Sequence, residues 1–577
     1  MKNRNERLIL YQLLVRQFAN SGSPNLPGGN WSVNGSGTFD GLSSEILKSI
    51  HDLGYNAIWL TGILRHASRS DNPAAGKQLN HPSLVKGMAG SPYAIEDYFS
   101  IDPDLLSRPN DAWTEWKECA DRIHAQGMKI IIDFVPNHCA RNYQSPHARK
   151  AGLRDLGEGD RTDLAFHPEN HFYYLPGESL ALPEEIRLGS SDEYSEFPAR
   201  ATGNDCFRSD PGIEDWFETI KLNYGLDFST GKGYYSPIPP VWHYMKEVLL
   251  FWAKKGCDGF RCDMAEMVPL PFWEWVRDEV KAAYPELIFI AEVYNPELYR
   301  AFLDAGFDFL YDKAGTYDCL RAILEGHGDC RNLSGIWQQQ EGIQHRMLRF
   351  LENHDEQRIA SRFFAGNPFK ALPAFAAAAF SGKAGLMLYA GQEFGEPAEG
   401  REGFSGDDGR SSIFDYGCVP VIRKWLSGAI SDCQNLSENE NLIRNEYALI
   451  LKICQNEDAF SEGSFYDLQY ANPQSEEYNA QKIWTFMRIG RLKKFIVMCV
   501  LSDFDEQFNI KIPVHALEFS NISVDQNTIN RGVYSSIWHT KNTSHFPSIS
   551  SQMLAAVDGL EISMHGPAWS WHIFELK

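Results

Sequence analysis

Carboxylate side chains follow several short apolar segments of this sequence, and they are the residues best suited to chemistry. Apolar stretches end in Asp133-Phe-Val-Pro-Asn137-His138, Gly259-Phe-Arg261-Cys-Asp263, Ala291-Glu292 and Glu352-Asn-His354-Asp355. Carboxyl groups act as general acids, general bases and nucleophiles when their surroundings separate their pKa values. If these segments meet in the fold, the sequence predicts a carboxylate-based active site.

The pair Arg261 and Asp263 strengthens this interpretation. The two residues are two positions apart, so in a strand their side chains point to the same side, and the guanidinium then holds the acid ionised. An ionised carboxylate beside a second, more shielded carboxyl is what retaining glycoside hydrolysis requires, as nucleophile and acid/base. Each acid alone has a plainer interpretation as a helix N-cap. The interpretation as an active site is favoured because several acids are expected to meet at one place in the fold.

Amphipathic helices alternate with short buried strands over much of the chain. Helices are predicted at 111–126, 240–255, 271–284 and 371–380, and strands at 8–15, 55–60, 129–135, 257–262, 287–293, 307–311, 346–352 and 385–390. Alternating strands and helices build a parallel sheet, so the expected fold class is α/β, a (β/α)8 TIM barrel with catalytic groups at the strand ends. A doubly wound sheet is the alternative, although no GxGxxG follows the first strand.

The spacing of these elements predicts three domains. The segment between the third and fourth strands is too long for a structureless loop, which indicates an inserted subdomain. Near the C-terminus, β-rich runs replace the helical pattern and predict an antiparallel β-sandwich domain. The predicted boundaries are 1–138 and 241–458 for the barrel, 139–240 for the inserted domain B and 459–577 for the C-terminal β domain.

The amino-acid composition limits the classes of molecule that this protein is expected to bind. The 577 residues carry 54 Lys and Arg against 76 Asp and Glu, a net charge of −22. Such an acidic chain is a poor partner for nucleic acid or an anionic membrane, since phosphate backbones attract basic patches. Neutral ligands remain, and the 13% of aromatic residues suits both an apolar core and the CH-rich faces of sugars. The oligomeric state is left open.

The expected location is cytoplasmic, with export as the alternative. There are 11 cysteines and no CxxC pair, which is typical of a reducing compartment. The segment 2–15 resembles the start of a signal peptide, but Gln12 and Arg16 interrupt the apolar run and no small-x-small cleavage site follows. No apolar run of about 18 residues predicts a membrane span.

These motifs resemble the α-amylase family of retaining glycoside hydrolases. Its four signature regions are matched in order by 133–138, 259–263, the Glu292 segment and 353–355, each after a predicted strand. Ser91-Pro-Tyr93-Ala-Ile-Glu-Asp97-Tyr98 and Tyr389-Ala-Gly-Gln-Glu393 are also similar to family segments. The barrel, the insertion after the third strand and the C-terminal β domain agree with that family's architecture.

The resemblance implies a role for each matched residue. Asp263 would be the nucleophile, Glu292 the general acid/base and Asp355 the acid that grips sugar hydroxyls in the transition state. Arg261 would hold Asp263 ionised, and Asp133 would support Arg261 as a structural residue. The implied substrate-binding residues are Tyr93, which would stack on the sugar, His138 and His354, which would hydrogen-bond its hydroxyls, and Arg261.

Two features of the family, a bound calcium ion and the residues that follow the nucleophile, need separate comment. Calcium-dependent members use the residue matched by Asn137 with carboxylates from domain B, which here would be Asp205. A structural Ca²⁺ is therefore left open, and the chemistry itself requires no cofactor. Many starch-cleaving members carry Lys-His after the nucleophile, whereas here Met264-Ala-Glu266-Met267 follows, so Glu266 is a candidate for binding an acceptor-side sugar or for a salt bridge.

The leading functional expectation is hydrolysis of α-glucosidic bonds in malto-oligosaccharides or related α-glucans. Transglycosylation is the alternative, in which a sugar instead of water intercepts the same covalent intermediate. A non-catalytic binding or chaperone subunit is a remote alternative, since the three carboxylates and Arg261 are all retained. A metal hydrolase on the same barrel lacks the His-x-His pair that would be expected after the first strand.

Overall fold

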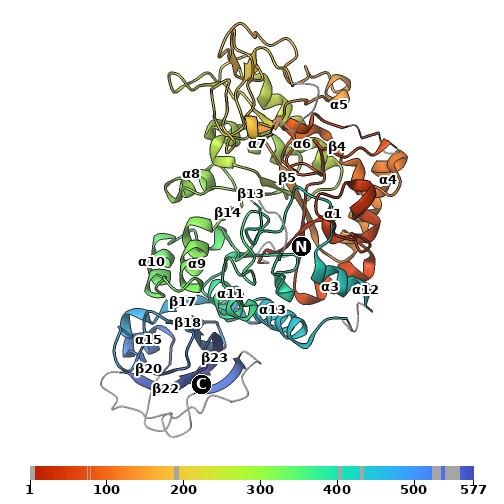
Figure 1. Ribbon diagram of the computed structural model, residues 1–577. Coiled ribbons are helices and arrows are strands. Elements are labelled where there is room, and N and C mark those ends of the chain that lie inside the picture. The colour runs from red at the N-terminus through yellow and green to blue at the C-terminus, as the bar shows by residue number, and fades with distance from the viewer. Residues whose placement is uncertain are drawn as a thin grey trace.

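Eight parallel strands form a closed barrel, which confirms the predicted (β/α)8 fold and excludes the doubly wound alternative. The computed structural model describes residues 7–73, 76–77, 79–186, 194–399, 406–428, 435–522, 534–539 and 559–576, with backbone only for 534–539. Around the ring the strands run β1-β16-β15-β14-β13-β12-β5-β2, so each strand lies beside its neighbours in the chain. Figure 1 shows the barrel between the insertion above and the C-terminal sheets below.

Each barrel strand overlaps one of the predicted strands. Their bounds are β1 (Ile9–Leu14), β2 (Ala57–Thr61), β5 (Lys129–Phe134), β12 (Gly259–Cys262), β13 (Ile288–Ala291), β14 (Phe309–Tyr311), β15 (Met347–Arg349) and β16 (Gly385–Tyr389). The ring closes where β1 pairs with β16, with Ile9 opposite Leu386. Strands that are buried on both faces consist of continuous apolar residues, and this pattern made them easy to predict from the sequence.

Alternate residues of each strand belong to two different layers. Leu10, Trp59, Ile131 and Met387 point inward and form the cluster that fills the barrel. Their chain neighbours, such as Ile58, join the larger core between strands and helices. The barrel interior is therefore packed with side chains, and a site can form only at its mouth.

The helices outside the barrel match the predicted ones closely. They include α4 (Ala112–Ala125), α6 (Pro240–Lys254), α7 (Leu270–Ala283) and α11 (Ala371–Phe380). After α4 the chain turns at Gly127, whose φ of +77° suits a residue without a Cβ. Every residue of α11 is buried, because this helix lies between the barrel and the C-terminal sheet. There the ring centroids of Phe380 and Trp571 are 5.6 Å apart.

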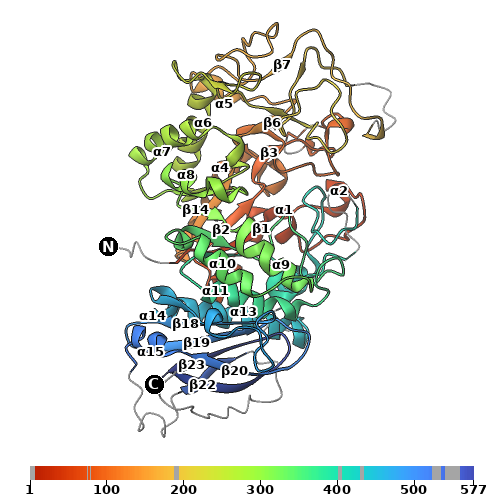
Figure 2. The ribbon, with the colours of Figure 1, turned by 90° about the vertical axis from the view of Figure 1, so that its left-hand side faces the viewer.

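The chain between β5 and α6 forms short elements above the barrel mouth (Figure 2). They are β6 (His138–Ala140), α5 (Pro146–Lys150), β7 (Tyr174–Leu175), β8 (Ala199–Arg200), β9 (Thr219–Lys221), β10 (Leu226–Asp227) and β11 (Lys232–Gly233). Leu180, Leu182, Ala199 and Phe217 form a small core in this region. The strand β6 pairs with β9, which ties the start of this segment to its later part.

Two antiparallel sheets make up the C-terminal part. One has the order β17-β18-β19-β23-β21 and the other pairs β20 with β22. Their bounds are β17 (Ser464–Asp467), β18 (Ile483–Ile489), β19 (Lys494–Val500), β20 (Glu506–Ile512), β21 (Tyr534–His539), β22 (Leu560–Gly566) and β23 (Ser570–Leu576). The β-rich runs expected near the C-terminus include β18 and β19, which pair as an antiparallel hairpin. The long helix α13 (Glu438–Asn456) precedes these sheets. The numerical boundaries of the three domains stay a prediction.

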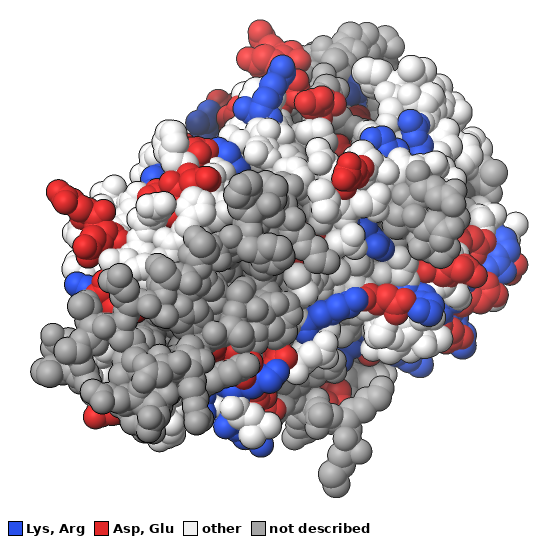
Figure 3. All heavy atoms as spheres, turned by 90° about the horizontal axis from the view of Figure 1, so that it is seen from below, with Lys and Arg blue, Asp and Glu red and all other residues white. Residues whose placement is uncertain are grey.

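Charged side chains of both signs are mixed on the surface. Figure 3 shows Lys and Arg lying between Asp and Glu on the described part of the lower face, in keeping with a chain that has no basic patch there. No helix in the described ranges is both long and apolar enough to span a bilayer.

Candidate active site

The ends of β5, β12 and β13 lie side by side at one edge of the barrel. The pairing of β5 with β12 places Arg261 opposite Asp133, and the last residues of β12 and β13 are paired with each other. Asp263 and Glu292 follow those last residues directly, so they leave the sheet at the same level. Their exposed fractions are only 6% and 3%. The sheet register therefore delivers two buried carboxylates to one point.

Arg261 is the centre of this cluster. Its Nη1 lies 2.6 Å from Asp263 Oδ1 and its Nη2 lies 2.7 Å from Glu292 Oε1. Asp133 Oδ1 lies farther away, 3.7 Å from Nη1, and the Arg261 Nε donates to the Tyr311 hydroxyl at 3.2 Å. Because one planar guanidinium contacts both Asp263 and Glu292, it fixes the position of each acid relative to the other.

The electrostatics separate the two acids. Burial raises the pKa of Asp263, and the charge and hydrogen bond of Arg261 oppose this increase. Burial also raises the pKa of Glu292; Arg261 opposes it, but the negative charge of Asp263 adds to it. Both acids therefore hold their protons more strongly than exposed carboxyl groups do, and the negative charge of Asp263 adds to this effect at Glu292.

Two further acids at this mouth hold protons more strongly than usual. Burial, followed by the charge of Glu292, raises the pKa of Asp355 to about 8. Burial raises the pKa of Asp133 to about 7, against the opposing charge of Arg261. The mouth thus holds more carboxyl groups than its one guanidinium can neutralise, and this excess is a physical signature of a functional site.

Two hydrogen-bond donors reach Glu292, in addition to its ion pair with Arg261. The Tyr294 hydroxyl donates to its Oε1 at 2.6 Å, and the backbone N–H of Met264 donates to its Oε2 at 2.7 Å. Met264 has a φ of +43°, in the left-handed region that side chains with a Cβ rarely adopt. This turn after Asp263 directs the N–H of Met264 to the second acid.

His354 and Tyr93 form a connected pair beside Arg261. Their rings stack with centroids 5.2 Å apart, and the Gln12 side-chain amide donates to His354 Nδ1 at 2.8 Å. With Nδ1 accepting, Nε2 carries the proton and donates to the Tyr93 hydroxyl at 2.5 Å. The Tyr93 hydroxyl lies 3.4 Å from Asp133 Oδ1, to which it donates. Burial holds the pKa of His354 well below its usual value, so the ring is neutral.

Asp355 follows β15 in the loop that carries His354. Its Oδ2 lies 3.2 Å from His354 Nε2, and its side chain is 30% exposed. The Asn353 side chain accepts its backbone N–H at 2.8 Å, and the Arg410 Nε donates to its carbonyl at 2.7 Å. Its backbone is therefore held on both sides while its carboxyl group stays accessible from the mouth.

His138 lies at the start of β6, where the barrel meets the insertion. Its ring packs against Trp216 with centroids 5.3 Å apart, and burial lowers its pKa to about 4. Trp216 thus touches a predicted site residue, whereas Phe172, Tyr173 and Tyr174 are buried, as expected for rings of a small core.

A lysine lies between the two residues expected to bind calcium. Lys221 Nζ donates to Asn137 Oδ1, lies 2.6 Å from Asp205 Oδ1 and donates to the Met267 carbonyl at 3.2 Å. The side chain is 2% exposed, and burial lowers its pKa. The residues therefore do not fit a calcium ion as arranged, because an ammonium group already lies among the oxygens that would bind the metal. Within the described ranges, no cluster of three His, Cys, Asp or Glu is arranged to hold a metal.

Glu266 makes backbone contacts. Its Oε2 accepts the N–H groups of Tyr294 and Asn295, each at 3.1 Å. These contacts hold the loop after β13, so Glu266 acts on the loop that carries Tyr294. The predicted sugar contact of Glu266 stays a prediction.

Tyr294 and Lys221 are the residues that sequence reasoning missed. A signal for Tyr294 existed, since it lies two positions after Glu292 and period two places both side chains on one side. Lys221 carries no motif, and it reaches Asn137 only because β9 pairs with β6 with Lys221 opposite His138.

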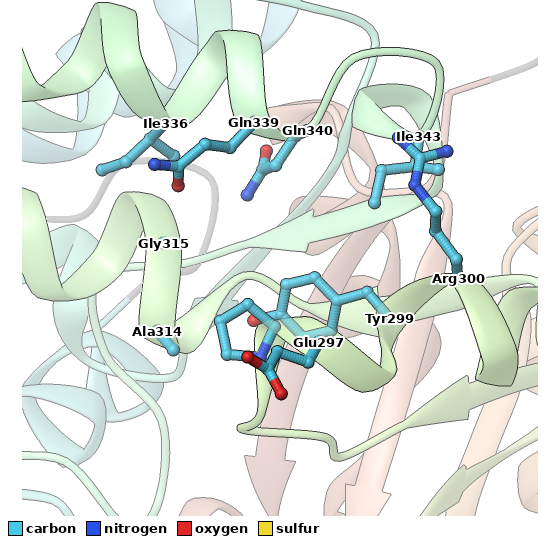
Figure 4. Close-up of a pocket in the computed structure, with 10 residues that line it drawn as sticks. Glu297, Tyr299, Arg300, Ala314, Gly315, Ile336, Gln339, Gln340 and Ile343 are labelled. Atoms are coloured by element: carbon cyan, nitrogen blue, oxygen red, sulfur yellow. The ribbon is translucent and has the colours of Figure 1, made fainter.

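A separate cavity of about 240 Å³ lies behind the loop after β13 (Figure 4). It is lined by Pro296, Tyr299 and Arg300 on one side and by Gln339 and Gln340 at the end of α10 (Arg331–Gln339) on the other. The predicted site residues are absent from its lining, so it is distinct from the carboxylate cluster.

Comparison with known proteins agrees with this geometry. A family model described as the catalytic domain of alpha amylase matches residues 12–412. An alpha-amylase, MalA, from Haloarcula japonica is 26% identical over 449 residues, which is 77% of this chain and 51% of that protein. An alpha-1,4-glucan:maltose-1-phosphate maltosyltransferase from Cereibacter sphaeroides is 24% identical over 265 residues, 45% of this chain and 33% of that protein.

The chain thus spans about half of the first of these curated relatives and a third of the second. Among solved structures, the alpha-amylase from H. orenii is similar with a TM-score of 0.61 and 17% identity. That likeness covers 99% of this chain and 100% of the other. It therefore extends over the barrel, the insertion and the C-terminal sheets together.

Proposed function

The chain belongs to the α-amylase family, and on that premise we propose that it cleaves α-glucosidic bonds in malto-oligosaccharides or related α-glucans with retention of configuration. The observation that carries the proposal is the single guanidinium of Arg261 between Asp263 and Glu292 at the mouth of a closed barrel. Retaining glycosidases need two carboxyl groups about 5–5.5 Å apart, one ionised and one protonated.

In the proposed mechanism, Asp263 and Glu292 act in two steps. Glu292 gives its proton to the oxygen of the leaving sugar while Asp263 attacks the anomeric carbon, which forms a covalent glycosyl-enzyme. Glu292 then takes a proton from the attacking water, whose oxygen displaces Asp263 and releases the sugar. Burial of Glu292 and the charge of Asp263 support the first step, because both raise the pKa of Glu292 and keep it protonated.

The remaining residues at the mouth are proposed to bind the sugar. Asp355, with its carboxyl group partly exposed, would accept sugar hydroxyls and favour the distorted ring of the transition state. His354 and His138 would hydrogen-bond hydroxyls as neutral rings, consistent with the lowered pKa of each. Tyr93, which stacks on His354 and has the Arg261 guanidinium 5.5 Å from its ring centroid, would pack against the sugar.

Transfer to a second sugar is the alternative outcome of the same intermediate. The similarity to a maltosyltransferase over 265 residues favours keeping this candidate. The departure at Met264-Ala-Glu266-Met267 from the Lys-His of many starch-cleaving members points in the same direction. Water or an acceptor sugar would attack the same carbon, and only the acceptor-side contacts would differ.

We further propose that the protein works without a resident calcium ion. The Lys221 ammonium contacts Asn137, Asp205 and the Met267 carbonyl, and these are the hard oxygen atoms that calcium would otherwise use. The chemistry itself involves only carboxyl groups and needs no cofactor.

A cytoplasmic location is proposed as well, with export as the alternative. It is supported by the described cysteines, most of which are buried and none of which forms a disulfide within the described ranges. Recovery of the native protein from the periplasmic or culture fraction of its source would contradict this.

The decisive experiment is incubation of the protein with a panel of α-1,4, α-1,6, α-1,1 and cyclic glucans, with products resolved over time. The expected result is release of α-configured products from malto-oligosaccharides, seen by following the anomeric proton signal. Products longer than the substrate at high oligosaccharide concentration would assign transfer. Initial products of inverted configuration would overturn the retaining mechanism.

A further inference from the structure

Glu292 is surrounded by partners that differ in what they can do for it. Arg261 and the Met264 N–H can only donate, so each suits the carboxylate form of Glu292. The Tyr294 hydroxyl, 2.6 Å from Glu292 Oε1, can donate to a carboxylate and can also accept from a carboxylic acid. An acid/base group must exist in both forms during one turnover. Tyr294 is thus the partner among these three that suits both.

We propose that Tyr294 is a positioning residue that keeps Glu292 hydrogen-bonded in both of its protonation states, and that Glu266 sets the position of Tyr294. This inference rests on the proposed function, since it needs Glu292 to be the acid/base. It concerns the loop after β13 and its contact with Glu266, which lies in the loop after β12, where the chain departs from the common family pattern.

The proton balance of this role is simple. Before the first step, protonated Glu292 donates to the Tyr294 oxygen. When Glu292 gives its proton to the leaving oxygen, the Tyr294 O–H turns and donates to the new carboxylate. The second step reverses this turn as Glu292 takes the proton of the attacking water. Tyr294 stays neutral throughout, because burial and the Glu292 charge keep the pKa of its hydroxyl well above the usual value.

Glu266 holds Tyr294 through the backbone. Its Oε2 accepts from two successive N–H groups, those of Tyr294 and Asn295, so it fixes the chain direction at the point where the tyrosine leaves the strand end. The Tyr294 ring packs against the cluster inside the barrel. Backbone and ring are therefore both fixed, and the hydroxyl alone is left to rotate.

Several charged or titratable groups also face Glu292, and they set the background for any pH effect. Each acts on Glu292 or responds to its charge from a different element: Arg261 on β12, Asp263 after it, Tyr311 on β14, Asp355 after β15 and His138 on β6. The substitution used as a test must therefore leave all of them in place, and removal of one hydroxyl does so.

The test is Tyr294→Phe, with kcat/KM measured against pH on a malto-oligosaccharide, whose leaving sugar needs the proton of Glu292. The hydrogen bond to the charged carboxylate is stronger than the one to the neutral acid, so its loss disfavours the charged form more, and the basic limb of the profile should move to higher pH. The plateau should fall by about 10- to 100-fold, the range for a hydrogen bond to a charged group. A profile with an unmoved basic limb, whatever its height, would overturn the proposal.

Tyr299→Phe is the matched control. Tyr299 is five residues farther along, is also buried, and lines the separate cavity in Figure 4, away from the carboxylates. Its loss of a hydroxyl should leave the pH profile unchanged. An equal shift in this control would mean that any buried hydroxyl here alters the profile, and would overturn the specific role of Tyr294.

Glu266→Ala supplies the second variant, which decides the matter if Tyr294→Phe does not fold. It should shift the basic limb in the same direction by a smaller amount, while Glu266→Gln, which keeps an acceptor oxygen, should restore the wild-type limb. No shift in Glu266→Ala would overturn the role of Glu266 and, where Tyr294→Phe is lost, the proposal as a whole. Full activity in Glu292→Gln would instead refute the proposed function, so the two failures are distinguishable.

Discussion

Two buried cations lie near the same barrel mouth, and they are surrounded in opposite ways. Arg261 faces Asp263, Glu292 and, more distantly, Asp133. Burial lowers the pKa of Arg261, but Glu292 and its other anionic neighbours raise it well above its usual value. Three acids thus compete for one guanidinium.

Lys221 has a balanced set of partners instead. It meets one carboxylate, that of Asp205, together with the neutral oxygens of Asn137 and Met267. Burial lowers its pKa, with Asp205 opposing. Where one ammonium faces one carboxylate, both groups stay charged. Where several carboxyl groups surround one guanidinium, some of them stay protonated. The difference separates a site built for chemistry from one built to join segments.

The largest expected effect follows from removing the acids around Arg261. Asp263→Asn and Glu292→Gln should each lower kcat by at least about 1,000-fold, since each removes a group that forms or breaks a bond. Stopped assays on an activated α-glucoside would measure this, with circular dichroism showing that the fold is kept. Near-wild-type turnover in either variant would remove that residue from the mechanism.

A change in the cation itself should be the next largest. Arg261→Lys keeps the charge but replaces a planar fork by a point charge that cannot contact Asp263 and Glu292 in the same way. We expect kcat/KM to fall by about 100-fold, the range for loss of one oriented electrostatic contact. Steady-state kinetics would check this, and an unchanged kcat/KM would mean that charge alone is sufficient.

Removing the Lys221 ammonium should lower the free energy of unfolding more than it lowers the reaction rate. Lys221→Ala leaves the Asp205 carboxylate and two oxygens without their cation, at a cost of about 3 kcal/mol in the free energy of unfolding. Millimolar Ca²⁺ should then raise the Tm of this variant, because the freed oxygens suit that ion. The wild-type protein should show no change with Ca²⁺ or with a chelator. A fall in wild-type Tm on chelation would show that calcium binds despite Lys221.

The smallest effect, taken per unit of pH, concerns the dependence of stability on pH. The pKa of Asp133 is raised in the fold to about 7, so between pH 4 and 7 the folded state binds more protons than the unfolded state. Stability from this group is present below the unfolded pKa and is lost as pH rises towards 7, by at most about 1.4 kcal/mol per pH unit. Asp133→Asn should flatten that slope in urea titrations, and an unaltered slope would contradict the raised pKa.

The sequence predicted the parts of this molecule that depend on local pattern. All eight barrel strands and the helices α4, α6, α7 and α11 were found, because buried strands and amphipathic helices leave periodic signals. Asp263, Glu292 and Arg261 were found because they stand at strand ends, and the barrel brings all strand ends together. The family resemblance assigned their roles, which stay a prediction, while the structure places the three side chains together.

What sequence reasoning missed depends on contacts between distant segments. Lys221 becomes important only through the pairing of β9 with β6, and no local pattern marks that register. Glu266 was a candidate for a sugar contact or a salt bridge, and its contacts with the backbone of the next loop, which follow the left-handed turn at Met264, were not predicted. Tyr294 had a periodic signal, but its value is visible only once its partner Glu292 is placed.

The pairing of β1 with β16 also sets the earliest point during synthesis at which the barrel can close. Ile9 pairs with Leu386, so the first strand must wait for almost four hundred residues before its second neighbour exists. At the usual 5–20 residues per second, that interval is roughly 20 to 75 s on the ribosome. Gln12, which orients His354, lies on that first strand. The ring that brings Asp263, Glu292 and Asp355 to one mouth therefore cannot close until β16 has been synthesised.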